Sequence, residues 1–142
     1  MVCGGEDNDS TAYPNWRARD SAEFYSPAYC VPGARPQITL APTLIQYGSV
    51  NHRLKFTYTG NGGSYTANSL RVVLMRPGSV THHFDAEQRY IELQVAGTKQ
   101  TGTSTQVDFL GPDDQTMASK GYYMLFAVVD GWPSVASIVL VN

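Results

Sequence analysis

The feature that most constrains this fold is a series of short apolar runs, each closed by glycine or proline. Apolar and polar residues alternate in Arg53–Thr59, which is the period of a strand with one buried face. Gly121–Asp130 is apolar on both faces, as expected for a central strand of a sandwich. No segment shows the period of an amphipathic helix. Strands are therefore expected at 37–41, 53–59, 69–76, 90–97, 104–111, 121–130 and 137–142.

About seven short strands separated by turn signals predict an all-β protein, an immunoglobulin-like β-sandwich. The pattern occupies residues 35–142. Residues 1–34 show no periodicity, contain several prolines and are expected to form an extended lead-in or linker segment. Within them, 22–29 is the one candidate for a short strand, ending at Pro27.

Composition narrows the function classes. The chain has 142 residues, 42% of them hydrophobic, and a formal net charge of −2. This length suits one globular domain, and the charge gives no basic footprint for nucleic acid. No apolar run reaches the roughly 18 residues of a membrane span. The first residues lack the features of a signal peptide, so we expect a piece of a longer polypeptide or an intracellular protein.

Cys3 and Cys30 are the two cysteines of the chain. They are either unrelated thiols or one disulfide that ties the lead-in to the domain. A bridge closing about 27 residues would contribute on the order of 3 kcal/mol and would imply an oxidising compartment.

Two histidines, His82 and His83, occupy an expected turn between strands, where Gly, Asn, Asp or Pro would be commoner. Imidazole is a common metal ligand, so this loop is a candidate metal site together with Asp85 and Glu87. Adjacent side chains in an extended loop point in different directions, so the two histidines are not expected to chelate one ion. A simple solvated side chain is the alternative for each. His52, just before a strand, is expected to be exposed.

One arginine and the aromatic residues also have candidate roles, and two alternatives stay open for the aromatic residues. Arg89 is expected to pair with Asp85 or Glu87 and to fix the loop. Tyr122 or Tyr123, at the start of the most buried strand, would form a tyrosine corner with nearby backbone or simply pack in the core. The remaining aromatic candidates, which would form either a sugar-stacking platform or internal anchors, are Trp16, Trp132 and the nine tyrosines. No serine triad and no phosphate-binding loop is indicated.

Three segments together resemble the C-terminal domain of the galactose oxidase and glyoxal oxidase family, the copper radical oxidases. They are ARPQITLAP (34–42), RPGSVTHHFDAEQRYIEL (76–93) and GYYMLFAVVDGWPSVASIVLV (121–141). The lead-in AEFYSPAY is similar to the segment that joins that domain to a kelch propeller. The resemblance implies an early-set immunoglobulin-like fold and an extracellular or cell-surface location.

The same resemblance implies a role for the histidine loop. In that family the histidine after the S-V-T triplet, here His82, is a copper ligand, and no ligand stands at the position of His83. The other ligands and the radical cofactor lie on the propeller, which this chain does not contain. The chain alone is therefore not expected to oxidise alcohols or aldehydes with release of hydrogen peroxide, as the parent oxidase would.

The chain departs from the family pattern at a few positions. Ser119 and Lys120 stand where prolines are usual, Glu87 replaces an aspartate and Cys30 replaces a leucine. Two other functions therefore stay open. One is a non-catalytic binding or structural module, with carbohydrate as its candidate ligand, and the other is a small metal-binding protein using His82 and His83.

Overall fold

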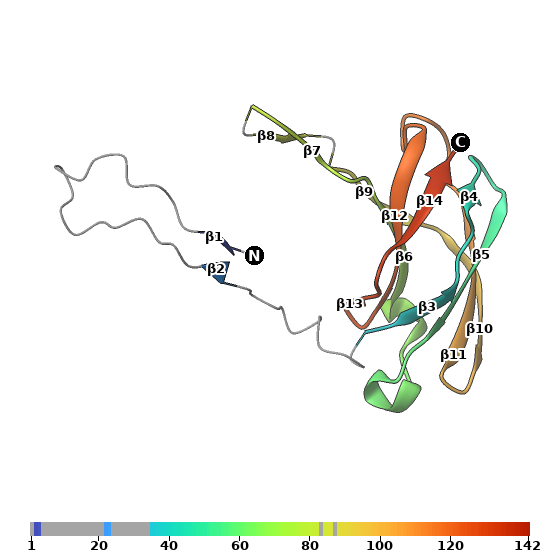
Figure 1. Ribbon diagram of the computed structural model, residues 1–142. Helices are drawn as coiled ribbons and strands as arrows, with labels where there is room; N and C mark the ends of the chain where they lie inside the picture. The colour runs from blue at the N-terminus through green and yellow to red at the C-terminus, as the bar shows by residue number, and fades with distance from the viewer. Residues whose placement is uncertain (1, 4–21, 24–34, 83, 87) are drawn as a thin grey trace. The chain divides into compact units, whose positions relative to one another are not determined.

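The computed structural model describes residues 2–3, 22–23, 35–82, 84–86 and 88–142 (Figure 1). The chain divides into two compact units, Met1–Val31 and Pro32–Asn142. In the first unit, β1 (Val2–Cys3) pairs antiparallel with β2 (Ala22–Glu23). The rest of the predicted strand at 22–29 lies outside the described residues, as does Cys30.

The second unit is a sandwich of two sheets (Figure 1). The four-stranded sheet has the order β10 (Val95–Thr101), β11 (Ser104–Leu110), β5 (Asn51–Thr57), β3 (Gln37–Leu40). The six-stranded sheet has the order β4 (Leu44–Ile45), β14 (Ser137–Val141), β12 (Gly121–Val129), β6 (Leu70–Met75), β9 (Tyr90–Leu93), with β13 (Trp132–Pro133) paired to β12. The neighbours are antiparallel except for β4 and β14, which are parallel. The all-β sandwich prediction is confirmed.

One core lies between the two sheets. The inward positions of β5, β11 and β12 alternate with outward ones, as the strand period requires. The largest fully buried side chains are Tyr123, Phe56, Phe109, Ile45, Leu54, Leu74 and Leu125. Two buried hydroxyl groups are satisfied: Thr105 Oγ1 accepts from Tyr65 (2.9 Å), and Ser134 Oγ accepts from the Ala127 amide (3.1 Å).

The single strand predicted at 90–97 is wrong in one respect, because the chain changes sheets within it. β9 ends at Leu93 in the six-stranded sheet, and β10 begins at Val95 in the four-stranded sheet. The carbonyl of Gln94 accepts a hydrogen bond from Leu110 N (2.9 Å), and the register shifts between Val95 and Gly97. Such a bend joins the two layers at a corner of the sandwich.

Two short 3₁₀ helices, η2 (Gly60–Gly63) and η3 (Ala67–Ser69), connect β5 to β6. Gly60 lies directly against the Tyr58 ring, where a Cβ atom would come within 2.3 Å of the hydroxyl oxygen. In the part of the chain that the structure describes, no helix is long and apolar enough to cross a membrane.

Candidate functional site

The β7–β8 hairpin, which carries His82, is a small sheet of its own between β6 and β9. β7 (Ser79–Thr81) pairs with β8 (Phe84–Ala86), and neither strand pairs with the two sandwich sheets. Figure 1 shows the hairpin extending away from the ends of β6 and β9. Val80 and Phe84 are each 77% exposed. The predicted turn with a strand on either side is confirmed.

His82 occupies a position where its backbone is strained. Two residues connect the paired Thr81 and Phe84, and two-residue hairpin turns require a positive φ at their first residue. His82 has a φ of 53° and is exposed. A residue with a Cβ pays roughly 1–2 kcal/mol for this left-handed conformation, which glycine would avoid. Strain of this kind is a reason to look for function in the side chain.

The base of the hairpin is fixed by two arginines. The Arg76 amide donates to the Arg89 carbonyl (3.1 Å). The Arg89 guanidinium donates through Nη1 to the carbonyls of Thr116 (2.9 Å) and Met117 (3.0 Å). The predicted pairing of Arg89 with Asp85 or Glu87 falls on acidic side chains that the structure does not describe, so it stays a prediction. The hairpin base is thus tied to the loop between β11 and β12.

This loop is itself held in place by side chains. Asp114 Oδ1 accepts hydrogen bonds from the amides of Thr116 (2.7 Å) and Met117 (3.1 Å). The Thr116 hydroxyl also donates to it, and these bonds hold the pKa of Asp114 below its ordinary value. Tyr47 donates to the Ala118 carbonyl (2.8 Å), and burial raises the pKa of Tyr47. The sequence showed a turn here, and the spacing of Asp114 and Thr116 would have indicated an Asx turn.

Tyr123 forms the tyrosine corner that the sequence left open between two residues. Its ring is fully buried, and its hydroxyl donates to the Ser119 carbonyl, four residues upstream, at 2.9 Å. Tyr122 is 66% exposed instead. Arg76 lies over the Tyr123 ring at 5.9 Å and bonds the Ser119 hydroxyl. Ser119, a departure from the family pattern, therefore contributes to the same network.

His52 is not exposed as predicted. It lies within β5 on the side that faces the core, half-buried, with its ring 5.7 Å from that of Phe109. Its Nε2 accepts a hydrogen bond from the Gln46 amide (3.1 Å). The prediction failed because the strand begins at Asn51, two residues earlier than expected, which brings His52 into the alternation.

No complete metal site is present in the described part of the chain. Among those residues, no group of three His, Cys, Asp or Glu side chains lies close enough to hold an ion. His83 and Glu87 lie outside the described residues, and the side chain of Asp85 is not described. His82 is therefore the candidate ligand that can be placed.

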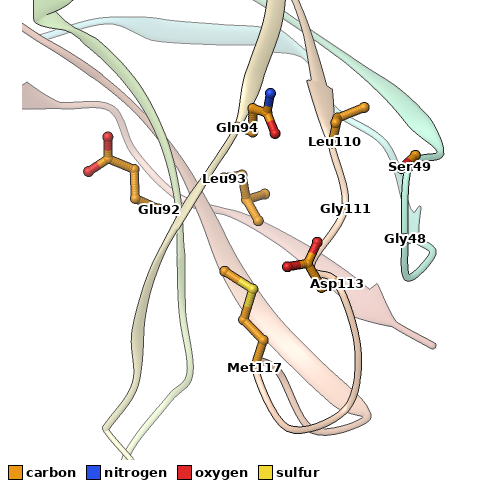
Figure 2. A pocket seen from close by; sticks show the side chains of 9 residues that line it. All are labelled: Gly48, Ser49, Glu92, Leu93, Gln94, Leu110, Gly111, Asp113 and Met117. Carbon is orange, nitrogen blue, oxygen red and sulfur yellow. The ribbon is translucent and has the colours of Figure 1, made fainter.

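A pocket of about 240 Å³ lies elsewhere on the sandwich (Figure 2). It is lined by Gly48, Ser49, Glu92, Leu93, Gln94, Leu110, Gly111, Asp113 and Met117. Its volume is below the roughly 300 Å³ at which small-molecule sites begin, and His82 is not among its lining residues. It does not provide a substrate site next to the hairpin.

The fold and the hairpin agree with one family. A family model described as the galactose oxidase-like early set domain matches residues 35–141. The chain belongs to this family. The resemblance found in the sequence is thereby confirmed.

Two relatives of this early set domain are oxidases. An aldehyde oxidase of Arabidopsis thaliana, GLOX1, is 31% identical over 122 residues, which cover 80% of this chain and 19% of that protein. The structure of a fungal alcohol oxidase of the AA5 family, in complex with copper, is 28% identical with a TM-score of 0.56. The match covers 82% of this chain and 22% of the chain of the fungal enzyme. The chain thus spans about a fifth of the length of these relatives.

The aromatic residues of the early set domain serve mainly as internal anchors. Tyr47, Tyr65 and Tyr123 donate hydrogen bonds to groups inside the domain. Tyr58 contacts Asp130 at 3.4 Å, and burial raises the pKa of Tyr58. Trp132 is half-buried in β13, and Trp16 lies outside the described residues. These contacts favour the anchoring alternative for these four tyrosines, whereas Tyr90 and Tyr122 are exposed.

Proposed function

We propose that this chain is the C-terminal accessory domain of a copper radical oxidase of the galactose and glyoxal oxidase type. Its contribution is one copper ligand, the imidazole of His82. The observation that carries the proposal is the strained backbone of His82, at the tip of a hairpin outside both sandwich sheets. The copper-containing alcohol oxidase among the relatives supports the choice of metal.

The residues present fit a partial site. Neutral imidazole is a suitable copper ligand, and His82 is exposed at the tip. A defined copper site needs about three or four ligands, so the others and the redox-active tyrosine come from outside this segment. Copper there, with that tyrosine, would take two electrons and two protons from an alcohol or aldehyde hydrate and pass them to oxygen, giving hydrogen peroxide. The role of this chain is to bring His82 to that site and hold it.

The partner is a propeller domain of the kelch type in the same polypeptide. The relatives are about five times as long as their match to this chain, which leaves room for such a domain. Val80 and Phe84 flank His82 with exposed apolar side chains, and a partner that receives the hairpin would cover them. Arg89 and Arg76, at the hairpin base, limit the direction in which the tip can point. We further propose an extracellular location, where a Cys3–Cys30 bridge would persist.

The test uses the full-length polypeptide that carries this segment. His82→Ala should abolish copper-dependent alcohol or aldehyde oxidation and lower the copper content, while the protein still folds. His83→Ala is the matched control, since it removes the neighbouring imidazole, and it should keep copper and activity. Copper is measured by elemental analysis, activity by peroxide release and folding by circular dichroism.

Two results would overturn the proposal. Equal copper and activity in the His82→Ala protein would remove His82 from the site. An unaltered full-length protein without copper or oxidase activity would favour the alternative, a non-catalytic binding or structural module that has kept the fold.

A further inference from the structure

The two outer faces of the sandwich differ sharply in chemistry. On the four-stranded sheet, the outward rows defined by strand register are polar except for Leu40, which pairs with Lys55 and is 46% exposed. One row contains the Arg53–Asp108 ion pair (2.8 Å), and the next contains Lys99, Gln106 and Lys55. This polar face is what an antiparallel sheet presents to water.

The outer side of the six-stranded sheet is apolar instead. The burial pattern of β12 points Tyr122, Met124, Phe126 and Val128 away from the core. Register then extends these positions across the sheet into three rows. The rows are Leu44–Leu140–Tyr122, Ile138–Met124–Met75–Tyr90 and Phe126–Val73–Glu92. Val73 is only 1% exposed, so this chain already covers it. We call the other apolar residues of these rows the apolar face.

Several members of the apolar face are exposed in this chain. Tyr122 is 66% exposed, Ile138 61% and Tyr90 56%. Among the positions that strand register places on this side, the charged residues are Glu92, which ends a row, and Arg71, which pairs with Val128. An apolar centre with charges at its border is the composition of a protein–protein interface. Contiguous apolar surface of this kind marks a docking site in soluble proteins.

The apolar face continues into the hairpin. Its second row ends at Tyr90, the first residue of β9, just after the hairpin returns to the sheet. The hairpin adds Val80 and Phe84, each 77% exposed. A body that receives the hairpin is therefore adjacent to the apolar face and can cover both.

We propose that the apolar face is the docking surface for the domain of the same polypeptide that also receives the β7–β8 hairpin. This rests on the proposed function, which supplies that domain. A second copy of this chain is the less suitable occupant. A symmetric pair would have to accommodate two projecting hairpins, each with Val80 and Phe84 77% exposed. The relatives, in contrast, have about four-fifths of their length outside this segment.

Thiol protection tests the proposal. Ile138→Cys places a reporter on the apolar face, and Lys99→Cys places an exposed control on the polar face, both in a background with Cys3 and Cys30 replaced by serine. Each variant is made in the 142-residue chain and in the full-length polypeptide. Maleimide labelling of the peptide that carries the new cysteine is followed by mass spectrometry at several protein concentrations.

We expect both reporters to label at similar rates in dilute 142-residue chain. In the full-length polypeptide, Ile138→Cys should label at least tenfold more slowly, whereas Lys99→Cys should not change. Equal labelling of Ile138→Cys in both proteins would overturn the proposal. Protection in the short chain that grows with concentration would assign the face to a second copy. A gene that encodes no further domain upstream of this segment would exclude the proposed occupant.

The readout is separate from the oxidase function. Labelling needs neither copper nor turnover, so a protected apolar face in a protein without oxidase activity would refute the proposed function alone. Loss of activity in His82→Ala with an unprotected apolar face would refute the docking proposal alone.

Discussion

The tyrosine corner at the start of β12 allows a sharp test of the sandwich, because two neighbouring tyrosines differ in environment. Tyr123→Phe removes a hydroxyl that donates to the Ser119 carbonyl at 2.9 Å and lies 3.4 Å from the Ser119 hydroxyl. Tyr122→Phe removes the same atom from a side chain that is 66% exposed. The substitutions are chemically identical, so their difference isolates the corner.

The expected loss for Tyr123→Phe follows from one hydrogen bond. A neutral hydrogen bond contributes about 0.5–1.5 kcal/mol net, and a buried acceptor left without a donor adds to the loss. The surroundings of the Ser119 carbonyl are only partly buried, so water can partly replace the donor. The fully buried ring keeps its packing and its contact with Arg76. We expect a loss of about 1–1.5 kcal/mol, or a melting temperature lower by about 3–7 °C for a domain of this size.

Thermal and urea unfolding of both variants measure this difference. Tyr122→Phe should stay within about 0.5 kcal/mol of the unaltered chain, as exposed substitutions usually do. If the two variants lose the same amount, the corner contributes nothing and the reasoning is wrong. A loss above about 4 kcal/mol for Tyr123→Phe would mean that the ring, and not the hydrogen bond, has been disturbed.

Three further predictions concern His82, the two cysteines and two aspartates. His82→Ala should change the free energy of unfolding of the 142-residue chain by less than about 0.5 kcal/mol, and a large loss would mean that His82 is structural. The unaltered chain alone should bind copper only weakly, and tight stoichiometric binding would mean that it holds a complete copper site. Cys3 and Cys30 should be bridged after oxidative folding, so a count of two free thiols in denaturant would reject the disulfide. Asp108 and Asp114 have pKa values lowered in the folded state, the first mainly by the hydrogen bond from its arginine partner and the second mainly by that from a threonine hydroxyl. Their stabilisation is therefore present above the ordinary value of 3.8 and is lost as the pH falls through the folded values. Melting temperatures between pH 6 and 2.5 should fall below about pH 4, and Asp114→Asn should reduce that slope; an unchanged slope would contradict the assignment.

Local pattern was sufficient for most of the strands because alternation is a local property. The run at Arg53–Thr59 identified β5, although the strand begins at Asn51. The change of sheet at Gln94 could not be read in the same way, since Ile91, Leu93 and Val95 alternate without a break. β9 and β10 are separated at Gln94, whose carbonyl accepts a hydrogen bond from the amide of Leu110, a residue much later in the chain. Register with distant strands is absent from a local pattern.

In the candidate site, too, local pattern predicted one part and missed another. The turn at the tip was visible because strand residues flank it on both sides. The contacts at the base of the β7–β8 hairpin could not be predicted, since Arg89 bonds carbonyls 27 and 28 residues away along the chain. Those acceptors are backbone atoms, which any residue type provides, so no side-chain pattern marks them. The ion pair of Arg89 with Asp85 or Glu87 stays a prediction, and the two carbonyl bonds at 2.9 and 3.0 Å are additional contacts that the sequence did not indicate.

β12 has apolar residues on its outer side as well as on the side that faces the core. A central strand in a two-layer sandwich needs apolar residues on its inner side only, because the outer side faces water. β5 follows this rule, with Arg53 and Lys55 outward. β12 does not, since Met124 and Phe126 point outward. The docking proposal accounts for this run, because a strand that another domain covers on its outer side favours apolar residues on both faces.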